Sequence, residues 1–305
     1  MGKGLRQTAP DVIDVQGLWE YKSYVNYRHF ANTGTPYLIT PQGMLDPWAL
    51  KRSRIKKFSA KLLYENCHLA NAKCLRATSE REATEFRKLG LKNPIAIVPN
   101  SVQIPHLSNK PPITSRKRIL FMGRIHPVKG IDYLLRAWGE LDSEFKDWDL
   151  VIAGPDEIGY LAEMQEYAEK LNCQRIHWCG AVYGDAKQEL YESCDLFVLP
   201  THTENFGLVV AEALSYSLPV ITTVFTPWSG LSDKACGWCI ELNDDALQNS
   251  MECALASPLG ELQQMGSRGR AWIESEFGLE RVSDSMSQVY NWIALGVDQP
   301  GFVHE

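Results

Sequence analysis

The chain has 305 residues, of which 45% are hydrophobic and 22% charged, so it is long enough to bury one large core or two ordinary ones. No apolar run approaches the roughly 18 residues that span a bilayer. The first ten residues lack the apolar core of a signal peptide, so we expect a cytoplasmic protein. The net charge is −6, but residues 1–105 hold 16 Lys and Arg against 8 Asp and Glu, and the remainder holds 15 against 29. The basic first part therefore suits an anionic acceptor or membrane surface.

Residues 1–105 alternate between strand-like and helix-like patterns. Strand-then-turn patterns occur in DVIDVQG (11–17), PYLITPQG (36–43) and AIVPNSV (96–102). Helical spacing occurs over residues 58–72 and 79–90, and the second predicted helix has Ser79 at its N-cap and Glu82 at the capping-box position.

The rest of the chain repeats a longer unit, a short buried strand followed by a turn and a helical pattern. The strands are RILFMG (118–123), WDLVIAG (148–154) and DLFVLP (195–200), with PVITT (219–223) after the last helix. Continuous apolar strands that alternate with helices predict a doubly wound parallel α/β sheet.

A segment rich in Pro and Ser, residues 103–117, has no periodicity and is typical of an interdomain linker. We therefore expect one α/β domain over residues 1–105 and a second over residues 106–280. A final helix and tail occupy residues 281–305.

Eight cysteines are scattered along the chain, and without a secretory signal we expect them to be reduced. Cys236 and Cys239 in CGWC have the spacing of a redox pair. A thioredoxin-like site would place that motif at a helix start after the first strand. Here it lies late in the chain in a predicted short strand, which favours a structural role.

Two loops of the second domain lie where open α/β sheets bind ligands, at the carboxyl ends of strands. The first is GRIHPVKG, in which Gly123 lets the backbone turn and Arg124 and Lys129 present two cations that could neutralise a diphosphate. The alternative is an exposed basic turn.

The second loop begins THTENFGLVVAEAL (201–214). Gly207 has no side chain to cover the backbone where a helix starts, so the amides of Phe206 to Leu208 can face an anion. Glu204 and Glu212 lie roughly 9–12 Å apart along the helix axis, too far for the acid and nucleophile of a retaining glycosidase. They suit the two ends of an extended ligand such as a nucleotide sugar, and the alternative is a solvated helix face.

GRIHPVKGIDYLLRAW followed by ENFGLVVAEAL and PVITT resembles the retaining glycosyltransferases of family 4. GLWEY, PQGM, ATSERE and IAIVPNSV extend the resemblance through the first domain. It implies a GT-B fold of two Rossmann-like parallel-sheet domains facing a cleft. The implied activity is transfer of a hexose-like sugar from a nucleoside-diphosphate donor to a glycan or lipid-linked acceptor. No metal, no cofactor beyond the donor and no nucleic-acid partner are expected.

The resemblance also implies roles for individual residues. Arg124 and Lys129 would bind the donor diphosphate and, with Glu204, form the catalytic set. Glu204 would contact the sugar hydroxyls, and Glu212 would accept from the ribose. The other donor-binding residues would be Gly123, Asn205, Phe206, Gly207 and Leu208.

The chain departs from the family pattern mainly in its first domain. About 70–80 residues that family members carry at the N-terminus are missing, so we expect an incomplete N-terminal domain. Gln42, beside Gly43 in the acceptor-side cleft, and Gln16 stand where the family has histidines, and Ser217 replaces a glycine. The alternative function is therefore a nucleotide-sugar-binding protein, truncated or partner-dependent, without turnover.

Two other enzyme classes use similar α/β folds. A dinucleotide dehydrogenase is disfavoured because no G-x-G-x-x-G follows a strand, whereas a nucleotide-sugar epimerase shares the architecture and is harder to exclude.

LKRSRIKKFSAKLL (50–63) places six basic residues near Ile55, Phe58 and Leu62. This basic amphipathic pattern is compatible with peripheral contact with the inner face of an anionic membrane, and a solvated helix face is the alternative.

Overall fold

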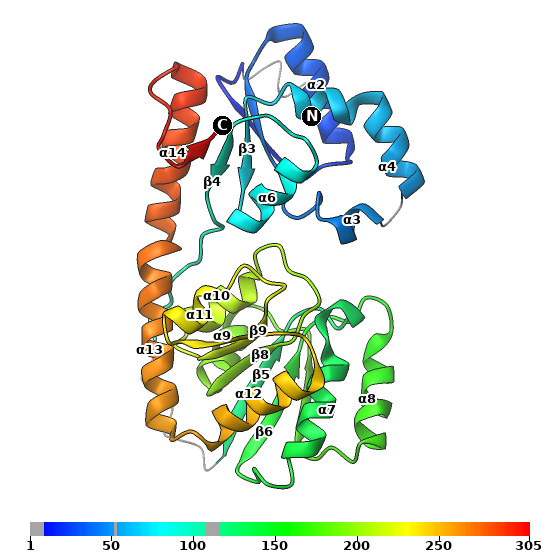
Figure 1. Cartoon of the computed structure of the whole chain (residues 1–305), viewed down its shortest axis with the longest axis vertical. Coiled ribbons are helices and arrows are strands. Elements are labelled where there is room, and N and C mark those ends of the chain that lie inside the picture. Colours follow the sequence, from blue (N-terminus) through cyan, green and yellow to red (C-terminus); the bar gives the residue numbers. More distant parts are fainter. Residues whose placement is uncertain (1–8, 52–53, 108–115) are drawn as a thin grey trace. The chain divides into compact units, whose positions relative to one another are not determined.

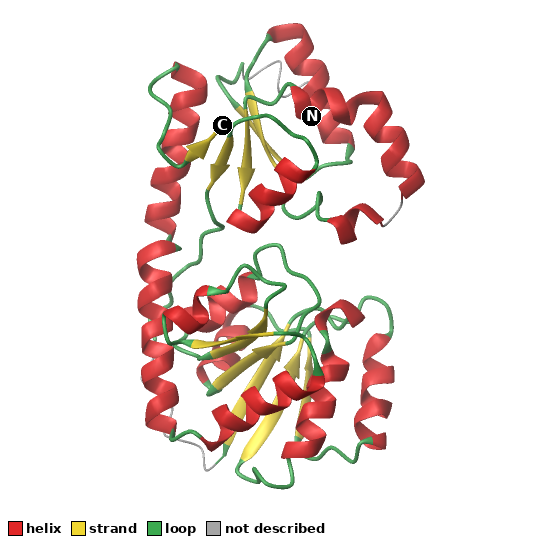
Figure 2. Cartoon of the chain, viewed as in Figure 1, coloured by secondary structure: helices red, strands yellow, loops and turns green. Residues whose placement is uncertain are grey.

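The computed structural model describes residues 9–51, 54–107 and 116–305, and the chain divides into two compact units (Figure 1). The first unit is made of two separate stretches of the chain, Met1–Ser101 and Leu279–Glu305, and the second unit is Val102–Gly278. In each unit, helices cover the faces of a sheet (Figure 2). The C-terminal segment, expected as a separate helix and tail, thus belongs to the first unit. Residues 108–115 of the predicted linker and residues 52–53 of the basic segment lie outside the described residues.

The sheet of the first unit has the order β1-β2-β3-β4-β11. Four of its strands are parallel, and the two-residue β11 pairs antiparallel with β4. The strands are β1 (Ile13–Gln16), β2 (Tyr37–Thr40), β3 (Cys74–Ala77), β4 (Ile95–Ile97) and β11 (Val303–His304). The sequence patterns did not include β3, which is only four residues long and entirely buried.

Helices connect these strands and close the unit. They are α2 (Tyr21–Thr33), α3 (Pro47–Lys51), α4 (Arg54–Ala60), a π-helical turn η1 (Lys61–Glu65), α5 (Asn66–Ala70), α6 (Glu80–Lys88) and α14 (Leu279–Leu295). The predicted N-cap of α6 is confirmed, because Ser79 Oγ accepts from Glu82 N–H at 3.2 Å. The Glu82 carboxylate, which a capping box would direct to Ser79, accepts instead from Thr78 N–H and Gly43 N–H, each at 2.7 Å.

The C-terminal segment joins this unit because the second face of its sheet needs an apolar cover. Side chains alternate along a strand, so Tyr37 and Ile39 enter one core cluster while Leu38 enters the other. In α14, Val282, Met286, Val289 and Ile293 recur at helical spacing, and these side chains form a stripe against the face of Leu38.

The sheet of the second unit has six parallel strands in the order β10-β9-β8-β5-β6-β7. They are β5 (Lys117–Met122), β6 (Trp148–Ala153), β7 (Ile176–Gly180), β8 (Leu196–Leu199), β9 (Val220–Thr223) and β10 (Gly237–Ile240). The predicted doubly wound sheet is confirmed, and β7 is the strand that the apolar patterns missed. Its burial alternates along the strand as befits a sheet edge, so it lacks the continuous apolar run of a central strand.

The helices of this unit lie on both faces of the sheet (Figure 2). They are η2 (Pro127–Lys129, 3-10), α7 (Ile131–Leu141), α8 (Tyr160–Lys170), α9 (Gly184–Glu192), α10 (Leu208–Ser215), α11 (Gly230–Asp233), α12 (Asp244–Ala256) and α13 (Leu259–Glu276). α7 packs against α12 and α8, and α10 packs against α13. Ser217, in the position of the family's glycine, adopts a φ of 60° at the end of α10, so it keeps the backbone conformation that a glycine favours.

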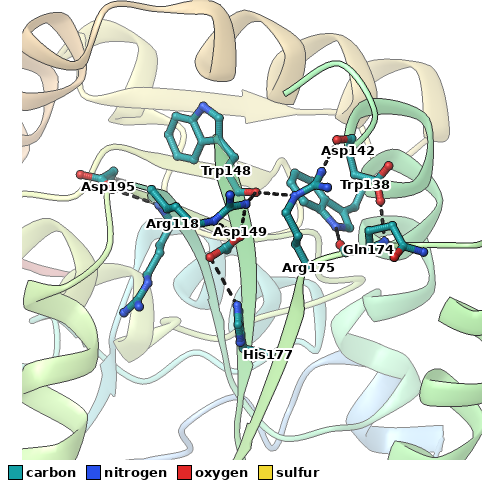
Figure 3. Close-up of polar contacts among 10 residues, drawn as sticks. Arg118, Trp138, Asp142, Trp148, Asp149, Gln174, Arg175, His177 and Asp195 are labelled. Carbon is teal, nitrogen blue, oxygen red and sulfur yellow. Dashed lines mark hydrogen bonds and ion pairs between the residues drawn. The ribbon is translucent and has the colours of Figure 1, made fainter. Parts of the chain in front are cut away.

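The amino ends of β5, β6 and β7 carry a polar network (Figure 3). Asp149, which is 5% exposed, accepts from Arg116 Nε at 2.9 Å and lies 3.4 Å from His177 Nε2. Arg175 Nε donates to Trp148 O at 3.1 Å. Partnering of this kind is what a buried carboxylate requires. The network lies at the amino ends of these strands, whereas ligands of open α/β sheets bind at the carboxyl ends. We therefore assign it a role in the stability of the unit.

Candidate active site

The strand order of the second unit reverses between β5 and β8. From β5 the chain moves to β6 and β7, and from β8 it moves the other way to β9 and β10. Ligands of open α/β sheets bind at such a switch point, beyond the carboxyl ends of the strands. The two loops selected from the sequence follow these two strands, so the topology brings them to one place.

The loops are in direct contact. Thr201 Oγ1 donates to Val128 O at 3.0 Å, and His202 N–H donates to the same oxygen at 2.8 Å. A Cβ built on Gly130 would lie 1.9 Å from Pro200 O. The loop after β5 therefore rests on the loop after β8, with a glycine at the closest approach.

Lys129 and Glu204, both predicted catalytic residues, form an ion pair across these loops. Lys129 is only 8% exposed and ends the η2 turn, whose cap is His126 Nδ1 accepting from Val128 N–H at 3.1 Å. Arg124 differs, because its guanidinium is half-exposed and lies 3.8 Å from Glu157 Oε2. The loop thus presents one buried, paired cation and one exposed cation.

Gly123 is not the glycine that this loop needs most. Its N–H continues the ladder to Ala153 O at 3.0 Å, and a Cβ there would meet only an ordinary contact. A Cβ on Gly154, however, would lie 1.7 Å from Gly123 O. The turn after β5 therefore approaches the backbone that follows β6, and Gly154, directly after that strand, makes this approach possible.

The segment from Asn205 to Leu208 enters α10 through a left-handed residue. Gly207 has a φ of 73° and is the N-cap of α10, with no side-chain cap hydrogen bond. Trp228 Nε1 donates to Phe206 O at 2.6 Å, so the indole fixes the carbonyl before the helix. A helix that begins without a side-chain cap leaves its first N–H groups available to water or to an anionic ligand.

Glu212 lies in α10 with 20% of its side chain exposed. Its Oε1 accepts from Lys187 Nζ at 2.6 Å and its Oε2 accepts from the Tyr191 hydroxyl at 2.9 Å. Burial and the neighbouring Glu212 carboxylate hold the pKa of Tyr191 well above its usual value, so this phenol is a donor. Both partners of this mostly buried glutamate lie on α9.

Sequence patterns missed α9 and with it Lys187 and Tyr191, as well as Trp228. The signal for the first two was their i, i+4 spacing in GDAKQELYES, which places both on one helix face. Trp228 in TPWSGL carried no periodic signal, because its role depends on the fold around Phe206.

In the first unit, the two glutamines that stand at histidine positions lie together at the carboxyl ends of β1 and β2. Gln42 Nε2 donates to Gln16 Oε1 at 2.7 Å, and Gln16 Nε2 donates to Asp14 Oδ1 at 2.7 Å. The Tyr290 hydroxyl donates to Asp14 Oδ2 at 2.7 Å. Gly43, with a φ of 76°, follows Gln42 in the same turn. Gln42 is exposed, so this amide network ends at the surface.

CGWC forms β10 and its flank, as expected for a structural segment. Cys236 is fully buried, and burial raises the pKa of its thiol to about 11, which makes it a poor nucleophile at neutral pH. Within residues 9–51, 54–107 and 116–305, no three His, Cys, Asp or Glu side chains gather closely enough to hold a metal ion. No helix in the described part of the chain is long and apolar enough to cross a membrane.

Two α/β units with parallel sheets, one of which carries a cation and glutamate cluster at its switch point, define a two-domain α/β protein of the GT-B class. The model of the family "Glycosyl transferases group 1" matches residues 104–272, and that of the "Glycosyl transferase 4-like domain" matches residues 3–101. The chain therefore belongs to the group 1 glycosyl transferases, and the predicted family is confirmed.

Relatives and solved structures agree with this assignment. An uncharacterized glycosyltransferase of Haemophilus influenzae is 28% identical over 67% of this chain, and the match spans 57% of that relative. Sucrose-phosphate synthase from Thermosynechococcus elongatus has a TM-score of 0.81 at 20% identity, covering 96% of this chain and 76% of that one. Anabaena HepE, solved with UDP-glucose, has a TM-score of 0.76 at 18% identity, covering 94% and 81%. These structural likenesses confirm the predicted fold, whereas the expected incompleteness of the N-terminal domain stays a prediction.

Proposed function

We propose that this chain is a retaining glycosyltransferase that moves a sugar from a nucleoside-diphosphate donor to a glycan or lipid-linked acceptor. The observation that carries the proposal is the cluster at the β5/β8 switch point. There Lys129 is paired with Glu204 beside the uncapped start of α10, and Arg124 lies exposed in the same loop as Lys129.

Each group has a part in the proposed reaction. Arg124 and Lys129 stabilise the negative charge that develops on the departing diphosphate, and the α10 amides add to this electrostatic stabilisation. Glu204 accepts from the sugar hydroxyls, and its ion pair with Lys129 fixes its position beside them. Glu212 accepts from the ribose hydroxyls. The solved complex of HepE with UDP-glucose supports a uridine nucleotide as the first donor to test.

Calorimetry with UDP, ADP and GDP tests the donor assignment. A charged hydrogen bond contributes about 1.5–3 kcal/mol, so Arg124→Ala and Lys129→Ala should each weaken binding of the preferred nucleotide about 10- to 100-fold. Lys170→Ala is the matched control, because Lys170 pairs with Glu166 on the exposed face of α8 in the same unit. Unchanged affinity in both site variants would overturn the assignment.

Turnover is tested separately by proton NMR of the early products formed with a sugar donor and a glycan acceptor. Retention is expected at the anomeric carbon, and an inverted product would refute the mechanism. Nucleotide binding without transfer or donor hydrolysis would favour the alternative, a nucleotide-sugar-binding protein. The Gln16–Gln42 pair favours that alternative, because neither amide becomes a cation near neutral pH.

The acceptor side is proposed to lie against an anionic membrane. Phe58, Leu62 and Leu63, in α4 and η1, are 68%, 74% and 76% exposed, within a first domain whose charge balance is basic. Exposed apolar side chains on a basic segment suit the interface of an anionic bilayer. Flotation with phosphatidylglycerol vesicles should recover the chain, and Leu62→Asp should lose that recovery. Leu295→Asp, at an equally exposed leucine of α14, should not.

A further inference from the structure

Glu212 is held by two donors that no part of the proposed mechanism uses. Lys187 and Tyr191 are four residues apart on α9 and reach different oxygens of the Glu212 carboxylate, at 2.6 and 2.9 Å. The Lys187 ammonium also lies 5.9 Å from the centre of the Tyr191 ring. The three side chains therefore form one cluster built by two helices.

The two donors differ in how firmly they are placed. Tyr191 is 1% exposed and its ring stacks on Tyr216 at 5.0 Å with an interplanar angle of 10°, so its hydroxyl has little freedom. Lys187 keeps 31% of its side chain exposed. The phenol therefore sets the plane of the carboxylate, and the ammonium offsets the desolvation of its charge.

An ionised carboxylate has about four acceptor positions, two on each oxygen. Tyr191 and Lys187 occupy one on each oxygen, which leaves one on each. Two neighbouring free positions match a vicinal diol, whose two hydroxyls each donate one hydrogen bond. A ribose carries such a diol at its 2′ and 3′ carbons, and a 2′-deoxyribose does not.

We propose that Lys187 and Tyr191 are positioning residues that orient Glu212 for bidentate recognition of the ribose 2′,3′-diol, and so set a preference for ribonucleotide donors. This rests on the proposed function, because it assumes that Glu212 faces the donor ribose. A ligand that covers Glu212 removes the water that still contacts its carboxylate. If Lys187 or Tyr191 is also missing, the charge loses a hydrogen-bond partner that water no longer replaces, and this desolvation penalty destabilises the bound state. The loss of either partner should therefore weaken recognition of the diol.

The test compares each ribonucleotide with its 2′-deoxy counterpart by calorimetry: UDP with dUDP, ADP with dADP and GDP with dGDP. The wild-type chain should bind the preferred ribonucleotide about tenfold more tightly than its deoxy form, the worth of one hydrogen bond to a charged group. Lys187→Met and Tyr191→Phe should reduce that ratio to about threefold or less. Lys187→Arg should keep the ratio, because it retains the charge and the donors.

Lys170→Met is the control for loss of a lysine–glutamate pair elsewhere in the unit, and thermal melts establish that each variant is folded. A ratio that stays at the wild-type value in both Lys187→Met and Tyr191→Phe would overturn the proposal. That result, together with weakened binding by Arg124→Ala, would leave the proposed function standing. If the wild-type chain binds none of the three ribonucleotides, the proposed function and this inference fail together.

Discussion

Gly130 lies where the two loops of the candidate site approach most closely. Replacing it by alanine tests whether their contact is as close as the structure indicates. The residue has a φ of 66° at the junction of η2 and α7. A Cβ there would lie 1.9 Å from Pro200 O and 3.0 Å from Pro200 C. Neither atom belongs to a side chain that could rotate away, so the backbone of one loop must move.

Two costs add in Gly130→Ala. The left-handed conformation costs an L-residue about 1–2 kcal/mol, and forcing an extra carbon into a packed site costs about 1–3 kcal/mol. The free energy of unfolding should fall by about 2–5 kcal/mol. That is a large part of the roughly 5–15 kcal/mol that stabilises a typical native state.

Gly159→Ala supplies the matched control. Gly159 is the N-cap of α8 with a φ of 79°, and nothing lies within 4 Å of a Cβ placed there. Alanine at that position should cost only the conformational part, about 1–2 kcal/mol. Urea unfolding followed by tryptophan fluorescence measures both variants, and Gly130→Ala should be less stable by about 1–3 kcal/mol. Equal unfolding midpoints with equal m-values would refute the close approach of the two loops.

Three further predictions concern stability. Burial raises the pKa of Asp149, but hydrogen bonds and charges from Arg116 and His177 outweigh this, so that its pKa lies below the usual value. A carboxylate whose folded-state pKa is lowered stabilises the protein above the unfolded pKa of about 3.9, and this stabilisation is lost as pH falls through the folded-state pKa. Asp149→Asn should therefore lower the free energy of unfolding at pH 7. In a plot of the urea unfolding midpoint against pH, the variant should show a smaller fall below about pH 4 than the wild-type chain. Trp228→Phe removes the donor to the Phe206 carbonyl and should lower the free energy of unfolding by about 1–3 kcal/mol in urea titrations. Glu65→Ala removes a carboxylate that is 0% exposed and accepts from His68 Nδ1 and Trp19 N–H, and urea unfolding should show a loss of about 3–5 kcal/mol.

Each of these variants has a control in the same unit. Asp233→Asn changes an exposed aspartate of α11 and serves as the control for Asp149→Asn. If the urea midpoints of the two variants fall equally steeply as the pH is lowered, the first prediction is wrong. Trp238→Phe alters a half-buried tryptophan of β10 and should lower the free energy of unfolding less than Trp228→Phe does. Glu85→Ala breaks a surface pair with Lys88, where a loss below about 1 kcal/mol is expected. A comparably small effect of Glu65→Ala would show that its buried contacts do not stabilise the unit.

The patterns along the chain determined which residues form most of the strands and which loops carry the cations and glutamates. Runs such as RILFMG and DLFVLP predict buried strands because every side chain of a central parallel strand is covered. The Ser79 cap was equally readable, because its partner lies three residues away. Where the pattern was weak, elements were missed: β7 alternates at a sheet edge, and α9, which carries Lys187 and Tyr191, follows it.

Only the tertiary structure decided which of these elements meet. It paired Lys129 with Glu204 across 75 residues and Glu212 with Lys187 across 25. It also brought Gln16 and Gln42 together and returned α14 to the first unit. The physical reason is that periodicity records whether a residue faces a core, whereas partnership depends on the order of strands and on the face that each crossover helix covers. That order is settled by burial of the whole sheet, and no local stretch of sequence contains it.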